Sequence, residues 1–140
     1  MFEPVLNAEE VTTYVREVFS EADVYNWQVK EVRPGGIAVL MQTDEAHIRP
    51  GGTVSGPTMF ALADITAYLL ILAHIGKVAL AVTTNLSINF LSKPEPGLLE
   101  AHGRLVKLGK RLAVCEIHIY GPDRETMVAQ ATATYSIPPR

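Results

Sequence analysis

One apolar stretch dominates the hydrophobic pattern of this 140-residue chain and runs from residue 57 to residue 75. Its apolar side chains are distributed all round a helix instead of along one stripe, which predicts a helix buried on most sides. Pro57 suits the first helical position, Ser55 or Gly56 can act as the N-cap, and Gly76 ends the helix. We therefore expect a long core helix in the middle of the chain.

A single carboxylate, Asp64, interrupts this stretch about two turns after its start. Burial raises the free-energy cost of its charge, and the positive end of the helix offsets only part of that cost. An acid kept in such a place either makes structural hydrogen bonds or takes part in chemistry. The stretch is almost long enough to span a membrane, but the internal acid and the glycine- and proline-rich entry favour a core helix with no membrane partner.

Shorter patterns on both sides predict one further helix and a series of strands. Asn7 and Glu10 form a capping box, and apolar residues at helical spacing predict an amphipathic helix over residues 8–20. Alternating apolar and polar positions bounded by glycine and proline predict strands at residues 27–32, 37–42, 78–91, 98–107, 111–120 and 127–137. In the strand at 78–91, alternation places Thr83 on one face with Asn85, Ser87 and Asn89.

The order of these elements predicts an α+β fold. Short turns between the last strands indicate antiparallel pairing. A row of small side chains in the last strand, followed by Tyr135, predicts close approach of the central helix; the row comprises Ala129, Ala131 and Ala133. We expect a single domain over residues 1–140, in which a curved antiparallel sheet wraps the central helix and the N-terminal amphipathic helix packs on the body.

Composition restricts the possible partners. The chain has 12 Lys and Arg against 15 Asp and Glu, a net charge of −3, which gives no basic surface for nucleic acid. The single cysteine, Cys115, cannot form an internal disulfide and has no neighbouring cysteine, which argues against zinc and predicts a reducing compartment. The first residues lack the pattern of a signal peptide, so we expect a cytoplasmic protein.

The loop and helix over residues 49–64, together with the strands that follow, resemble a known protein family. The series Arg49-x-x-Gly52-Thr53-x-Ser55-Gly56-Pro57, with Asp64 eight residues after Gly56, resembles the PaaI-like acyl-CoA thioesterases of the hotdog fold. Their usual pattern is N-x-x-G-x-x-H-G-G followed by an acid on the helix. The segments TTNLSINFLSKPEPG and GRLVKLGKRLAVCEIHIYG resemble the family's next strand, its proline-rich turn and the hairpin after it. The resemblance implies a hotdog fold, a curved antiparallel sheet around one long helix.

The resemblance also implies a reaction, the hydrolysis of the thioester between an acyl or aryl-acyl group and coenzyme A. Asp64 would activate the attacking water or attack the thioester carbon itself. The backbone N–H of Gly56 would polarise the thioester oxygen, as unpaired N–H groups at a helix start can do. Thr83 would help to hold the water, with Thr84 beside it. Coenzyme A would be part of the substrate, with no separate cofactor and no metal.

The chain departs from the family pattern at three positions. Arg49 stands at the Asn position, where it either holds a carboxylate of the acyl group or a phosphate of coenzyme A, or is simply an exposed loop residue. Ser55 stands at the His position and either donates a weaker hydrogen bond or only caps the helix. Pro57 replaces the second glycine and removes one N–H from the helix entrance.

The remaining substrate-binding candidates are less sharply defined. Gly52 belongs to the loop motif, and Asn85 follows Thr84 on its strand. Lys110 and Arg111 either meet the phosphates of coenzyme A or form a solvated hairpin tip. Edge strands of the sheet would pair with a second copy, which predicts a homodimer or a dimer of dimers, and the resemblance implies a site shared between two copies.

Two other functions remain open within the same fold. In the first, the changes at Arg49 and Ser55 have removed the reaction and left an acyl-CoA-binding protein. In the second, His47 and the helix acid form a dehydratase, although a surface histidine is the simpler interpretation of His47. His74 is expected near the C-terminus of the helix, where a positive charge is favourable.

Overall fold

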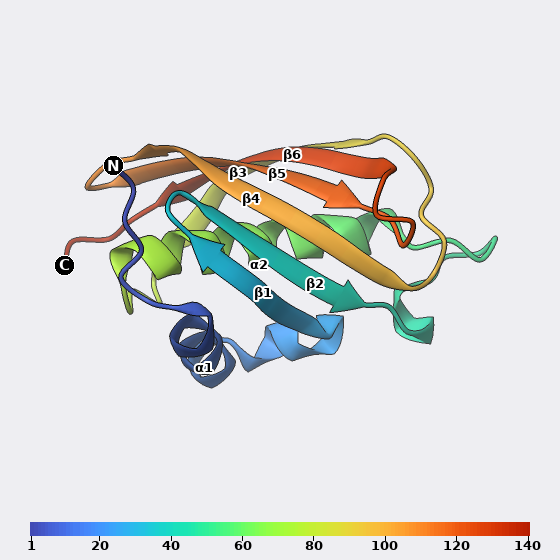
Figure 1. Ribbon diagram of the computed structural model, residues 1–140, viewed down its shortest axis with the longest axis horizontal. Helices are drawn as coiled ribbons and strands as arrows, with labels where there is room; N and C mark the ends of the chain where they lie inside the picture. The colour runs from blue at the N-terminus through green and yellow to red at the C-terminus, as the bar shows by residue number, and fades with distance from the viewer.

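The computed structural model describes residues 1–140 and contains a six-stranded antiparallel sheet that curves around one long helix (Figure 1). The strand order is β1-β2-β4-β5-β6-β3, so β1 and β3 form the two edges. The elements are α1 (Ala8–Val18), β1 (Trp27–Arg33), β2 (Gly36–Gln42), α2 (Gly56–Ile75), β3 (Val82–Phe90), β4 (Leu98–Leu108), β5 (Leu112–Tyr120) and β6 (Met127–Ser136), with 3₁₀ helices at Ser20–Tyr25 and Glu45–His47. The expected α+β hotdog architecture is confirmed.

The central helix α2 is the core of the molecule. Ser55 is its N-cap and Gly76 its C-cap, as two of the sequence signals predict. The helix is long and apolar enough to cross a membrane, but 78% of its most apolar 18-residue window is buried inside the protein. Its apolar surface is therefore covered by the sheet and by α1, which Figure 1 shows packed below β1 and α2.

The sheet approaches α2 most closely where its side chains are smallest. A Cβ atom on Gly103 of β4 would lie 3.2 Å from Cδ2 of Leu70 and 3.3 Å from Cγ2 of Thr66, both on α2. On β6 the predicted row of small residues faces inward and is buried: Ala129, Ala131 and Ala133. These positions allow the curved sheet to close on the helix.

Two predicted element boundaries are wrong by two residues or more. The first helix ends at Val18 instead of residue 20, because Phe19 leaves the helical conformation (φ −142°, ψ 58°) and the chain continues as a 3₁₀ helix. The strand expected from residue 78 begins at Val82, because the preceding residues form a turn in which the Ala81 N–H donates to the Val78 carbonyl.

The predicted faces of β3 also require correction. A bulge shifts the register with β6 between Thr83 and Asn85, so that two residues of β3 fill the space of one. Thr83 consequently faces α2, on the same side as the half-buried Leu86 and Ile88, instead of sharing a face with Asn85. Simple alternation cannot anticipate a bulge, because it assumes one residue per pleat.

Two histidines are buried and bonded to backbone groups. His47 is buried (3% exposed) instead of lying on the surface, since its Nδ1 accepts from the Asp44 N–H and its Nε2 lies 2.8 Å from the Val24 carbonyl oxygen. His74 is also buried; its Nε2 accepts from the Gly35 N–H and its Nδ1 lies 2.9 Å from the Leu70 carbonyl oxygen. His74 lies in the last turn of α2, as expected, but because one ring nitrogen accepts and the other donates, it links two backbone groups as a neutral ring instead of a cation.

The packing around α2 gives a stability prediction. Val39 on β2 is fully buried, whereas Val106 on β4 is 52% exposed. Val39→Ala should lower the free energy of unfolding by roughly 2–3 kcal/mol, because it removes buried methyl groups and leaves a cavity. The matched change Val106→Ala should stay within about 0.5 kcal/mol of the original protein. Urea unfolding at one protein concentration measures both, and equal losses in the two variants would contradict this description of the core.

Candidate functional site

An apolar cavity of about 260 Å³ opens beside the middle of α2, with Asp64 in its wall. It is lined by residues from the end of α1, from α2, from the turn before β3, and from β3 and β6: Val18, Phe19, Asp64, Ile65, Tyr68, Ala79, Ala81, Val82, Thr83 and Tyr135. Eight of the ten are hydrophobic. The cavity therefore suits an apolar group placed next to a carboxylate.

Two hydroxyl groups hold the carboxylate of Asp64. The Thr83 hydroxyl donates to Oδ1 at 2.6 Å, and the Tyr135 hydroxyl donates to the same oxygen at 2.7 Å. The Tyr135 hydroxyl also lies 3.1 Å from the backbone oxygen of Asp64. The other carboxylate oxygen, Oδ2, accepts no hydrogen bond from the chain. Asp64 is half-buried, so Oδ2 is the oxygen left for a partner outside the chain.

Burial and the charge of Asp64 raise the pKa values of two neighbouring side chains, Tyr135 and Cys115. Burial, followed by the negative charge of Asp64, raises the pKa of Tyr135 far above its ordinary value. The same two causes raise the pKa of the Cys115 thiol to about 12. Both groups therefore stay protonated at neutral pH, so Tyr135 is a hydrogen-bond donor and Cys115 an unreactive thiol.

A second cavity, of about 360 Å³, lies at the N-terminus of α2. Its lining combines the start of the helix with the loop before it and the end of β3: Arg49, Val54, Gly56, Met59, Phe90, Leu91, Ser92 and Lys93. The N–H of Gly56 makes no hydrogen bond within the chain. This cavity thus places an unpaired backbone donor beside two cationic side chains, Arg49 and Lys93.

The predicted acid and the predicted backbone donor do not share a cavity within one chain. Asp64 and Gly56 are eight residues apart on one helix, which corresponds to about 12 Å along its axis. They line two different cavities. A single thioester group is too small to reach both of them within one chain.

Ser55 acts as a cap in this structure. Its Oγ accepts from the Thr58 N–H at 3.2 Å and lies 2.7 Å from the Thr58 hydroxyl oxygen. Pro57 follows at the start of the helix and is exposed. Gly52 lies in the preceding turn with φ +88°, where its N–H donates to the Arg49 carbonyl. A side chain at Gly52 would be strained, which explains the glycine there.

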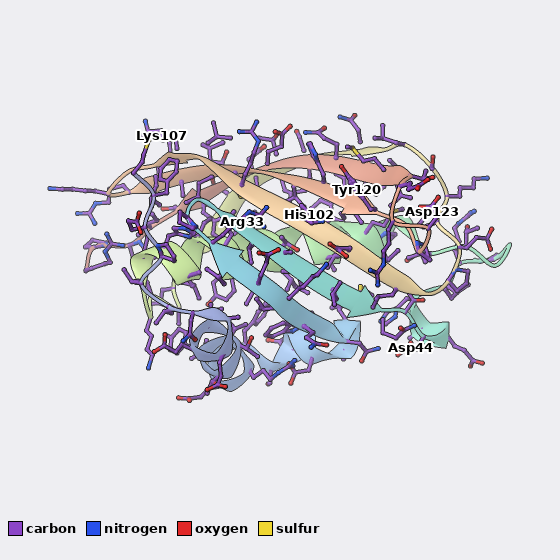
Figure 2. All side chains as sticks on the ribbon, viewed as in Figure 1. Arg33, Asp44, His102, Lys107, Tyr120 and Asp123 are labelled. Carbon is purple, nitrogen blue, oxygen red and sulfur yellow. The ribbon has the colours of Figure 1, made fainter.

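Four of the proposed substrate-binding residues do not line the Asp64 cavity. Thr84 is exposed at the bulge and donates to the Thr134 carbonyl, and Asn85 is exposed beside it. Lys110 and Arg111 are exposed in the turn between β4 and β5. Figure 2 shows Lys107, just before this turn, at the end of the sheet opposite to Asp123. The Ile137 N–H donates to the Arg111 carbonyl, which places this turn near the start of β3. The Gly56 cavity lies at the other end of β3, beside Phe90.

Sequence reasoning missed the role of Tyr135 and the aromatic wall beside it. Tyr135 stacks on Tyr68 with ring centroids 6.3 Å apart, and Phe19 meets Tyr68 edge to face at 5.8 Å. The one available signal was a tyrosine at the end of a row of inward-facing alanines. No group of three His, Cys, Asp or Glu side chains is placed to hold a metal ion.

Comparisons with known proteins agree with this architecture. The model of a family described as the thioesterase superfamily matches residues 51–128. A crystal structure of a "putative thioesterase" from Silicibacter sp. TM1040 is 46% identical, with a TM-score of 0.90 over 99% of this chain and 96% of that one. A "putative esterase" from Pseudomonas aeruginosa is 30% identical over 73% of this chain and 75% of its own length.

A more distant structure contains a ligand. A hypothetical thioesterase from Streptococcus pneumoniae, crystallised with coenzyme A, has a TM-score of 0.78 and 22% identity. The match covers 90% of this chain and 98% of that chain. At this identity the likeness concerns the fold.

The cap at Ser55 gives a prediction that separates it from other surface serines. Ser55→Ala should lower the free energy of unfolding by about 1 kcal/mol, because the Thr58 N–H loses its acceptor. Ser55→Asp should retain the stability, since a carboxylate caps equally well. Ser87→Ala, at an exposed position on β3, is the matched control. Chemical unfolding measures all three, and an unchanged value for Ser55→Ala would contradict the capping role.

Proposed function

Because this chain belongs to the thioesterase superfamily, we propose that it hydrolyses the thioester of an acyl or aryl-acyl coenzyme A, as a PaaI-like member of that superfamily. The observation that carries the proposal is the half-buried carboxylate of Asp64, which lines an apolar cavity and keeps Oδ2 unbonded. An apolar acyl group would occupy the cavity, with its thioester carbon near Oδ2.

Asp64 has one of two roles in this reaction. Oδ2 either takes a proton from the attacking water or attacks the thioester carbon itself. In both cases the carbon becomes tetrahedral, its oxygen gains negative charge, and the thiolate of coenzyme A leaves and takes up a proton. In the second case the acyl group is then bound to Asp64 as an anhydride, which water hydrolyses to release the acid and restore the carboxylate. Thr83 assists by its hydrogen bond to Oδ1 of Asp64.

The backbone N–H of Gly56 would stabilise the developing oxyanion. It is unpaired at the start of a helix, where the backbone is positively biased. Because Gly56 is about 12 Å from Asp64 along α2, we propose that it serves the Asp64 of a second copy.

The edge strand β3 supports such a shared site. It begins at Val82 and Thr83, beside Asp64, and ends at Phe90. A Cβ atom added to Gly56 would lie 3.4 Å from the Phe90 ring, so this end of β3 is beside Gly56. Two β3 strands paired antiparallel would set the start of one against the end of the other. Asp64 of each copy would then face Gly56 of the other. Val82 and Phe90 are 56% and 51% exposed, as expected for an edge that a second copy covers.

Coenzyme A is the proposed carrier of the acyl group. The streptococcal relative contained this molecule, and Arg49 and Lys93 beside Gly56 can meet its phosphates. Arg49 can alternatively bind a carboxylate on the acyl group. No further cofactor is part of the proposal.

A second candidate function is acyl-CoA binding without turnover. It is favoured by the engagement of the Ser55 hydroxyl in the helix cap, which leaves no histidine-like donor at that position. The dehydratase hypothesis loses support, because both ring nitrogens of His47 are engaged by backbone groups.

The first test is Asp64→Asn, assayed with a panel of acyl-CoA substrates by the release of free thiol. The rate should fall by about 10²–10⁴-fold, because the amide can neither accept the proton nor attack. Asp23→Asn, at an exposed position that pairs with Arg16, is the matched control. Equal rates in the original protein and Asp64→Asn would contradict the catalytic assignment. Binding of a thioether analogue without any turnover by the original protein would support the second candidate.

The shared site predicts complementation between two defective variants. Gly56→Pro removes the N–H, and its neighbour Ser55 has the extended conformation (ψ 154°) that precedes proline readily. Gly56→Pro and Asp64→Asn should each be inactive. Co-expressed in equal amounts, they should recover up to about a quarter of the activity, because each mixed dimer of a twofold pair has one intact site. No recovery from co-purified mixed dimers, or a strictly monomeric mass in light scattering, would argue against a site built from two copies.

A further inference from the structure

The Asp64 carboxylate receives both of its hydrogen bonds on one oxygen. A carboxylate has two oxygens and about four lone-pair positions, so donors can distribute over both. Here the hydroxyls of Thr83 and Tyr135 both donate to Oδ1, at 2.6 and 2.7 Å. The result is an asymmetric carboxylate with one saturated oxygen and one free oxygen.

The sheet delivers the two donors from adjacent positions. Thr83 on β3 and Tyr135 on β6 are register partners, and the bulge after Thr83 turns that residue toward α2. The carboxylate comes from the helix and both hydroxyls come from the sheet. The rotation of the Asp64 side chain is therefore fixed against a separate element, not by its own helix.

The Tyr135 side chain is held rigidly. It is 2% exposed and stacks on Tyr68, whose hydroxyl donates to the Ala79 carbonyl at 2.8 Å. The titratable groups near the carboxylate are Tyr135 on β6, Cys115 on β5 and Tyr68 on α2. The pKa of each is raised, so all three remain neutral near pH 7, and among them only Tyr135 hydrogen-bonds to the carboxylate.

We propose that Tyr135 is a positioning residue for the thioesterase reaction: it acts with Thr83 to fix the Asp64 carboxylate, so that Oδ2 alone faces the water or the thioester. The inference rests on the proposed function of Asp64 and adds a residue to it. Tyr135 does not contact the substrate in this role. A phenylalanine would fill the same space, so the hydroxyl is the group that carries the role.

Tyr135→Phe tests the proposal by its kinetic pattern. We expect kcat to fall by about 10- to 100-fold, as for the loss of one hydrogen bond to a charged group, with KM within about twofold. The acidic limb of the pH–rate profile should move to higher pH, because the lost donor favoured the ionised carboxylate. Thr83→Val should act in the same direction, and Thr83→Ser, which keeps the hydroxyl, should restore the profile.

The control is Tyr120→Phe. Tyr120 lies beside His102, as Figure 2 shows, and does not line the Asp64 cavity. Its kcat, KM and pH profile should match the original protein. If the original enzyme is active through Asp64 and Tyr135→Phe retains its kcat and acidic limb, the role of Tyr135 is overturned and the proposed function stands. A raised KM with an unchanged acidic limb would also overturn it, because that pattern indicates cavity packing alone.

A measurement without substrate separates the two proposals. Carbon-13 NMR of the side-chain carboxyl groups follows the protonation of Asp64, whose signal is identified by its loss in Asp64→Asn. The Asp64 carboxylate should protonate at higher pH in Tyr135→Phe than in the original protein. An unchanged titration in Tyr135→Phe overturns the role of Tyr135, whether or not the original protein is active. If the titration shifts but the original protein hydrolyses no substrate, the hydrogen bond is supported and the proposed function fails.

Discussion

The structure depends on the placement of one ionisable side chain inside an apolar helix. An aspartate in such surroundings needs donors, and α2 cannot supply them because its own N–H groups are engaged in helical bonds. The sheet supplies them from β3 and β6. The curvature of the sheet, the bulge in β3 and the small side chains of β6 all bring these strands close enough to α2 for two hydroxyls to reach one oxygen.

The hydrophobic pattern was sufficient for the architecture. The long apolar run, the capping signal at Ser55 or Gly56 and the stop at Gly76 placed α2 within one residue of its observed ends, since these signals are local. The ends of the strands after it were predicted within one residue for the same reason, except the start of β3, which was placed four residues too early. The position of β3 at the sheet edge, next to β6, was not predictable from adjacency in sequence, because long-range pairing decides it.

The candidate site was predictable only in part. Asp64 stood out because an acid in an apolar run is conspicuous, and Thr83 was reached by resemblance. Tyr135 was not singled out, because its role depends on a contact between residues 71 apart in sequence. His47 was misplaced because one of its two backbone partners, the Val24 carbonyl, is 23 residues away in sequence. Side chains whose function comes from distant partners are thus the ones that a pattern of neighbours fails to identify.

The position of both reactive groups on α2 has a mechanical consequence under the proposed function. Each helix would contribute its middle to one reaction centre and its first residue to the other. A displacement of α2 along its axis would change the geometry of two centres at once, with the acid moving in one and the backbone donor in the other. The two α2 helices of such a dimer would couple the geometries of its two reaction centres. The close contact between Gly103 of β4 and Leu70 of α2 would resist movement of each helix along its axis.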